Sequence, residues 1–172
     1  MSRASRKFLV LFVAALAVLA GALAAPAAAP KVLVNVDKDG VLLEGYDVIG
    51  FWTDKQPVQG DARFQSKFQG AIYWFASAEH KATFDADPAK YAPAYGAFCA
   101  YAASVNRVRP IDIHLFHFTD GRLMFQHSQN AWDRWFKDER GNTVKADKNW
   151  PGLVERKGSD KPVAVDYDEA AK

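Results

Sequence analysis

Residues 63–75 read RFQSKFQGAIYWF and carry the clearest fold signal in the chain. Two runs rich in aromatic and β-branched residues, 63–68 and 71–75, flank the dipeptide Gln69-Gly70. Two such runs joined by a two-residue, glycine-containing turn are typical of an antiparallel β-hairpin. The sequence therefore predicts a hairpin in the first half of the chain.

A helix is predicted directly after this hairpin. Ser77 is a candidate N-cap for a helix through residues 78–84, and Asp87-Pro88 is expected to end it. The small-residue stretch 95–104 is also expected to be helical.

A second hairpin is predicted further along, where residues 114–119 and 122–127 flank Asp120-Gly121. An Asp-Gly dipeptide between two apolar runs is a strong signal for a two-residue hairpin turn. Counting residue pairs outward from this two-residue turn predicts which side chains share a face of the hairpin.

Helices are expected to close the domain. Ser128 is a candidate cap for one helix, Gly141 interrupts it, and residues 143–149 form a last short helix. Residues 153–172 are expected to be a polar, mobile tail. The mixed order of strands and helices predicts the α+β class.

Residues 1–28 have the composition of a secretory signal peptide. A basic start precedes the apolar run 8–20, and small residues follow, with cleavage after Ala24 or Ala28. The basic residues are Arg3, Arg6 and Lys7. The apolar run is shorter than the ~20 residues that span a bilayer, so no stable membrane anchor is expected after cleavage. We expect a periplasmic or secreted protein.

The charge balance excludes one class of partner. The full chain of 172 residues carries a formal charge of +2, and loss of the three basic residues of the signal would leave a charge of −1. Nucleic acid is therefore not expected as a partner. The remaining chain has the length of one domain and a single cysteine, Cys99, which has no internal disulfide partner.

Several motifs resemble the YHS domain, a small hairpin-plus-helix module of copper-transporting ATPases and other metal-handling proteins. The motifs are FQGAIYWFAS at 68–77, His80, Phe84, DPAKY at 87–91, GYDV at 45–48 and YGAFCAYA at 95–102. The resemblance implies a YHS-like domain over residues 31–152, extended by the second hairpin and the C-terminal helices. Within this family, the chain resembles the exported bacterial members.

The chain departs from the family where metal-binding members carry a cysteine pair spaced i, i+4. Ala76 and His80 occupy those two positions, so the module's own metal site does not carry over intact. Cys99 stands where some exported relatives are thought to carry a redox-capable cysteine or selenocysteine.

The turn at Asp120-Gly121 places His114 opposite His127, with Cβ atoms about 5 Å apart. His117 then lies on the other face of the hairpin, where we expect solvent. His80 is expected to point toward the core or the mouth of a pocket.

These residues lead to one main hypothesis and two alternatives. The main hypothesis is a non-enzymatic protein that binds a transition metal, copper favoured and zinc second, through Cys99, His114, His127 and His80. The first alternative is an interaction or structural module with a protein partner and no metal; the histidine pair would then pack at the rim of the core. The second is a thiol-based redox protein that uses Cys99 alone. A buried, inert Cys99 remains open as well.

Overall fold

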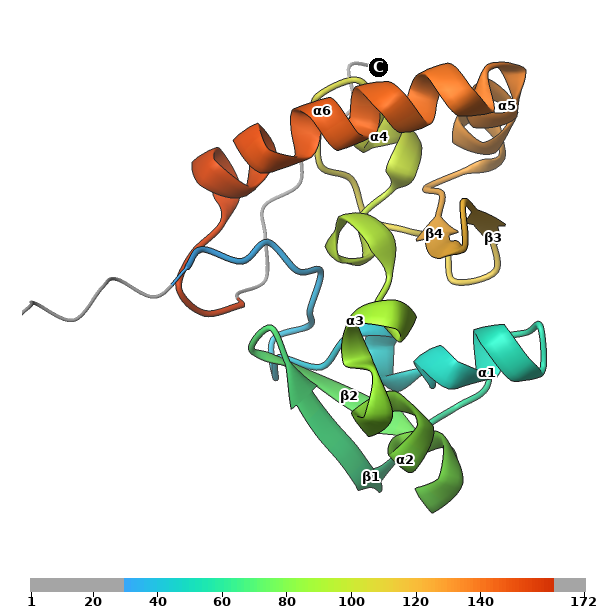
Figure 1. The fold of residues 1–172 in the computed structure, drawn as a ribbon, viewed down its shortest axis with the longest axis vertical. Helices are drawn as coiled ribbons and strands as arrows, with labels where there is room; N and C mark the ends of the chain where they lie inside the picture. The colour runs from blue at the N-terminus through green and yellow to red at the C-terminus, as the bar shows by residue number, and fades with distance from the viewer. Residues whose placement is uncertain (1–29, 163–172) are drawn as a thin grey trace, which may run out of the picture.

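The computed structural model describes residues 30–162 (Figure 1); the predicted signal peptide, residues 1–28, lies outside the described residues. In chain order the elements are η1 (Leu43–Gly45), α1 (Val48–Thr53), β1 (Asp61–Phe68), β2 (Ala71–Phe75), α2 (Ala78–Ala86), α3 (Pro88–Tyr91), η2 (Ala94–Ala97), α4 (Ala100–Ser104), β3 (Phe116–Thr119), β4 (Arg122–Phe125), α5 (Gln129–Lys137) and α6 (Glu139–Lys157). Strands β1–β2 and β3–β4 form two antiparallel hairpins among the helices. The predicted α+β class is confirmed.

The first hairpin turns where the sequence predicts. Gln69 and Gly70 both have positive φ, 49° and 80°, as a two-residue type I′ turn requires. Phe68 pairs with Ala71 across this turn. Alternate residues of β2 are buried, so one face of the hairpin packs on the core while β1 stays largely at the surface.

Helix α2 packs on the buried face of this hairpin. The Ser77 hydroxyl caps it by accepting the main-chain N–H of His80, as the sequence predicts. Phe84 of α2 is fully buried, and its ring centroid lies 4.6 Å from that of Tyr73 and 5.1 Å from that of Phe75. These aromatic contacts fix the helix against β2.

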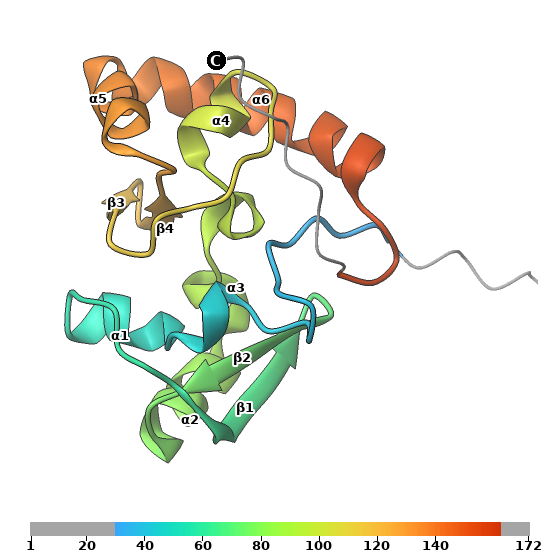
Figure 2. The same ribbon diagram turned by 180° about the vertical axis from the view of Figure 1, so that it is seen from behind.

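The second hairpin joins two hydrophobic cores. Its turn residues Asp120 and Gly121 also have positive φ. Leu123 and Phe125 belong to the core of the first hairpin, whereas Met124 belongs to a second core around Trp135 of α5. Figures 1 and 2 accordingly place β3–β4 between α1 on one side and α5 on the other.

The face of this hairpin that was expected to meet solvent is buried. His117, Thr119 and Gln126 are all less than a tenth exposed. The rings of Trp132 and Phe136, both from α5, pack against His117. The prediction of a surface position for His117 is therefore wrong, because α5 covers the face that the hairpin alone would leave open.

The extended segment that precedes η1 ties the two ends of the fold together. Val32 pairs with Ser159 after α6, the Asn35 N–H donates to the Gly96 carbonyl, and the Leu42 N–H donates to the carbonyl of Ile72 in β2. Figure 2 shows this segment, in blue, running from the end of α6 to the first hairpin.

The C-terminal helix is longer than predicted. The helix capped by Ser128 ends at Lys137, and α6 then runs unbroken to Lys157 through both Gly141 and Pro151. Leu153 is fully buried, so residues 153–157 belong to α6 and not to the polar tail predicted from residue 153. Burial of the α6 apolar side offsets the hydrogen bond that Pro151 cannot donate. No helix within residues 30–162 is both long and apolar enough to cross a membrane.

Candidate functional site at Cys99

Cys99 is the N-cap residue of α4, and its thiol is built into the local structure. The sulfur accepts the Ala102 N–H at 3.4 Å and donates to Oε1 of Gln126, also at 3.4 Å. The Cys99 N–H donates to the Arg109 carbonyl. With 1% of its surface exposed, Cys99 is a buried residue with directed contacts.

Burial raises the pKa of the Cys99 thiol. The main-chain N–H groups of Ala102, His127 and Tyr101 and the charge of Arg109 oppose this rise and favour the thiolate, but burial is the largest effect. The thiol is therefore protonated at neutral pH, and a ligand that needs the thiolate must displace the proton.

Gln126 links Cys99 to His117 through a buried chain of hydrogen bonds. Its Oε1 also accepts the Tyr101 N–H at 3.1 Å, which fixes the amide orientation. Its Nε2 then donates to Nε2 of His117 at 2.9 Å. The proton of His117 is accordingly on Nδ1, which donates to the hydroxyl of Thr119. Burial lowers the pKa of His117 to about 4, so this imidazole is neutral.

Cys99 and His127 line the same pocket, of about 240 Å³, which we call the Cys99 pocket. It lies between α4, the segment that follows α4, and the start of α5. Its lining residues are Cys99, Tyr101, Ala102, Val105, Arg107, Arg109, His127, Ser128, Asn130, Ala131 and Arg134. Two of the four residues that the sequence singles out thus meet here.

His114 does not continue the hairpin ladder opposite His127, as pairing arithmetic predicts. The ladder ends at the pair of Phe116 with Phe125. Just before Phe116 the chain forms a turn, in which the Leu115 N–H donates to the Asp112 carbonyl. The His114 N–H donates to the Asp112 carboxylate. His114 is exposed and is not among the residues that line the Cys99 pocket. The Asp112 turn explains the difference.

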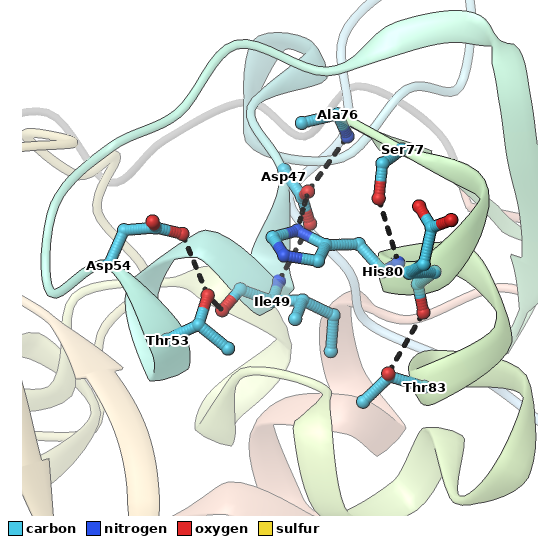
Figure 3. A network of polar contacts seen from close by, with 9 residues as sticks. Asp47, Ile49, Thr53, Asp54, Ala76, Ser77, His80 and Thr83 are labelled. Carbon is cyan, nitrogen blue, oxygen red and sulfur yellow. Dashed lines mark hydrogen bonds and ion pairs between the residues drawn. The ribbon is translucent and has the colours of Figure 1, made fainter.

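His80, on helix α2, lies in a separate polar network beside the first hairpin (Figure 3). Its Nδ1 is 2.6 Å from Oδ2 of Asp47, a fully buried carboxylate. Asp47 also accepts the N–H of Ile49, at the start of α1, and the N–H of Ala76, each at 2.8 Å. The pair joins α1 to the link between β2 and α2, and it holds the imidazole of His80 in one orientation.

The candidate ligands do not come together as a three-ligand metal centre in the described part of the chain. Within residues 30–162, no group of three or more His, Cys, Asp or Glu side chains is placed to hold a metal ion. The donors at the Cys99 pocket are one thiol and one imidazole.

Sequence reasoning missed the polar residues that support these sites. Asp47 carries a detectable signal, since an aspartate directly before a short apolar run is a typical helix cap. Gln126 shares a hairpin face with His117, but the sequence predicts that this face meets solvent. Arg107 and Arg109 are two residues apart, which in an extended segment places both on one side.

Comparisons of the chain with protein-family models, curated proteins and solved structures find no match.

Proposed function

We propose that this chain is an exported, non-enzymatic binding module of the YHS type whose ligand occupies the Cys99 pocket. The observation that carries the proposal is that Cys99 and His127, which are 28 residues apart in the chain, line one pocket. The YHS resemblance and the signal-like N-terminus support the family and the periplasmic or secreted location.

Copper is the favoured ligand, and the geometry favours its Cu(I) form. Thiolate and imidazole together suit a soft ion, and Cu(I) accepts as few as two ligands. Structural zinc is almost always four-coordinate, and the described residues bring only two of the predicted ligands to this pocket. Arg107, Arg109 and Arg134 also disfavour a dication there, whereas Cu(I) bound to a thiolate is neutral. The proposed ligands are thus Cys99 and His127; His80 and His114 are not included.

A binding module without metal is the second candidate. It is favoured by the existing contacts of the thiol, because the Cys99 sulfur already caps α4 and contacts Gln126. A redox role for Cys99 alone is disfavoured, because burial and a raised thiol pKa both reduce thiolate reactivity.

The test is a Cu(I) titration of the purified, reduced protein without oxygen, in competition with a chelator of known affinity. We expect one Cu(I) per chain, weakened at least tenfold in Cys99→Ser and in His127→Ala. His114→Ala is the matched control, because it removes an exposed imidazole outside the pocket and should bind as the wild type does. A parallel Zn(II) titration should show weaker binding.

Two results would separate the candidates. Absence of stoichiometric Cu(I) binding by folded wild type would overturn the copper proposal and leave the metal-free module. Fast alkylation of Cys99 in the native protein at neutral pH, at the rate of a free thiol, would instead support the redox alternative.

A further inference from the structure

The Cys99 pocket has a strongly positive lining. Three arginines, Arg107, Arg109 and Arg134, line it, and the described residues that line it include no aspartate or glutamate. The whole chain is nearly balanced, with 22 basic and 20 acidic residues, so this one-sided lining does not follow from composition. The guanidinium groups come from two separate parts of the chain, the segment after α4 and helix α5, which the fold brings together.

Two of these arginines are not neutralised by a carboxylate. Among the described residues, neither Arg107 nor Arg134 forms an ion pair; Arg134 Nε donates to the amide oxygen of Asn130, and its guanidinium lies 6.0 Å from the centre of the Tyr101 ring. Arg63, by contrast, forms an ion pair with Asp61. The positive charge at the pocket mouth is therefore available to a ligand.

Neutral polar groups complete the wall. The pocket includes Ser128 and Asn130 at the start of the nine-residue helix α5. The partial positive charge of a helix N-terminus adds to the field of the arginines and favours an anion. Guanidinium groups bind carboxylate and phosphate oxygens through paired, charge-assisted hydrogen bonds.

We propose that the Cys99 pocket binds a small oxyanion with at least two negative charges, held by Arg107, Arg109 and Arg134. A volume of about 240 Å³ suits a phosphate-sized or small dicarboxylate ion rather than a nucleotide. The anion does not depend on copper, because a Cu(I)–thiolate pair is neutral and leaves the charges of Arg107 and Arg134 uncompensated. The inference thus goes beyond the proposed function.

The test is calorimetric titration of the metal-free protein with inorganic phosphate and, separately, with malonate, in a low-salt buffer without other multivalent anions. We expect saturable binding of at least one of them with a Kd below about 1 mM, weakened by added salt. The tighter of the two identifies the ligand as phosphate-like or as a dicarboxylate. Arg107→Gln and Arg134→Gln should each weaken binding about tenfold.

Arg140→Gln is the matched control, because Arg140 is exposed on α6 and does not line the pocket. Saturable binding that is weakened in Arg107→Gln and Arg134→Gln but unchanged in Arg140→Gln supports the site. Failure of both anions to saturate, or equal weakening in all three variants, would overturn it. Cys99→Ser should still bind the anion, so loss of copper binding and loss of anion binding are separate outcomes.

Discussion

The carboxylate of Asp47 meets three donors in a place that water does not reach. It accepts main-chain N–H groups from Ile49 and Ala76 and contacts the His80 ring, and it is fully buried. A buried donor left without a partner costs about 1–3 kcal/mol. The carboxylate therefore stabilises the fold mainly by providing an acceptor for these donors.

Asp47→Ala should lower the free energy of unfolding by about 3 kcal/mol or more, because it leaves several buried donors without a partner. Urea denaturation followed by circular dichroism measures the change. Asp61→Ala is the control: it removes an exposed ion pair with Arg63 and should change stability little. Equal effects of the two substitutions would contradict the role given to Asp47.

His117 makes stability depend on pH. Its folded pKa, about 4, lies below the ordinary value of 6.5, so the unfolded chain binds a proton that the folded chain does not. Stability from the neutral imidazole is complete above pH 6.5 and is lost as the pH falls toward 4, by about 3 kcal/mol in total.

His117→Gln should therefore flatten the fall in unfolding free energy between pH 6.5 and 5, even though it lowers stability at neutral pH. Urea denaturation at several pH values in this range measures the slope. His114→Gln, at an exposed histidine, should keep the wild-type slope. An unchanged slope in His117→Gln would show that another group causes the dependence.

At the scale of elements, Gly96 in η2 is where the backbone leaves no room for a side chain. Its φ is +55°, and a Cβ atom would lie 2.0 Å from the Leu33 carbonyl oxygen. The Gly96 carbonyl accepts the Asn35 N–H at 2.8 Å, so this close approach holds the N-terminal segment against η2. Only glycine fits both demands.

Gly96→Ala should lower stability by roughly 2–4 kcal/mol, because strain in the left-handed region is added to a backbone clash. Gly121→Ala offers a matched comparison: its φ is +70°, but nothing lies within 4 Å of the added Cβ. It should cost only about 1 kcal/mol. Thermal or urea unfolding measures the stability of both variants. If Gly96→Ala is as stable as Gly121→Ala, η2 shifts to make room for the added methyl group.

At the scale of the whole molecule, the end of α6 packs into the core and the segment after it pairs with the N-terminal segment. Leu153 is fully buried in the second core, and Ser159 pairs with Val32 in the segment that leads to the first hairpin. The second hairpin and this N-terminal segment thus connect the two cores, and we expect them to unfold together.

Ending the chain after Gly152 should lower its stability, relative to a chain that ends after Pro162, by at least the ~2–5 kcal/mol typical of losing a buried leucine side chain. Urea denaturation of the two truncated chains measures the difference, and Leu153→Ala in the full chain isolates the packing contribution. Equal stability of both truncated chains would mean that residues 153–159 are dispensable, as a polar tail from residue 153 would be.

The candidate site was only partly predictable. Cys99 and His127 stand out in the sequence because thiol and imidazole groups are rare in this chain, with one cysteine and four histidines. Their shared pocket, its arginines and the link through Gln126 come from segments distant in the chain. No sequence pattern predicts that Arg109 and Arg134 line the same pocket.

The local features follow from the sequence alone: both hairpin turns and the caps at Ser77 and Ser128. These depend on residues at most four apart, so turn geometry and side-chain caps fix them before any packing. The tertiary structure alone decided that His117 is buried, that His114 leaves the ladder, and that α6 continues through Pro151. The burial of His117 and the continuation of α6 each depend on packing against an element from elsewhere in the chain, and the apolar surface so buried outweighs the local preference. His114 leaves the ladder because the chain turns at Asp112.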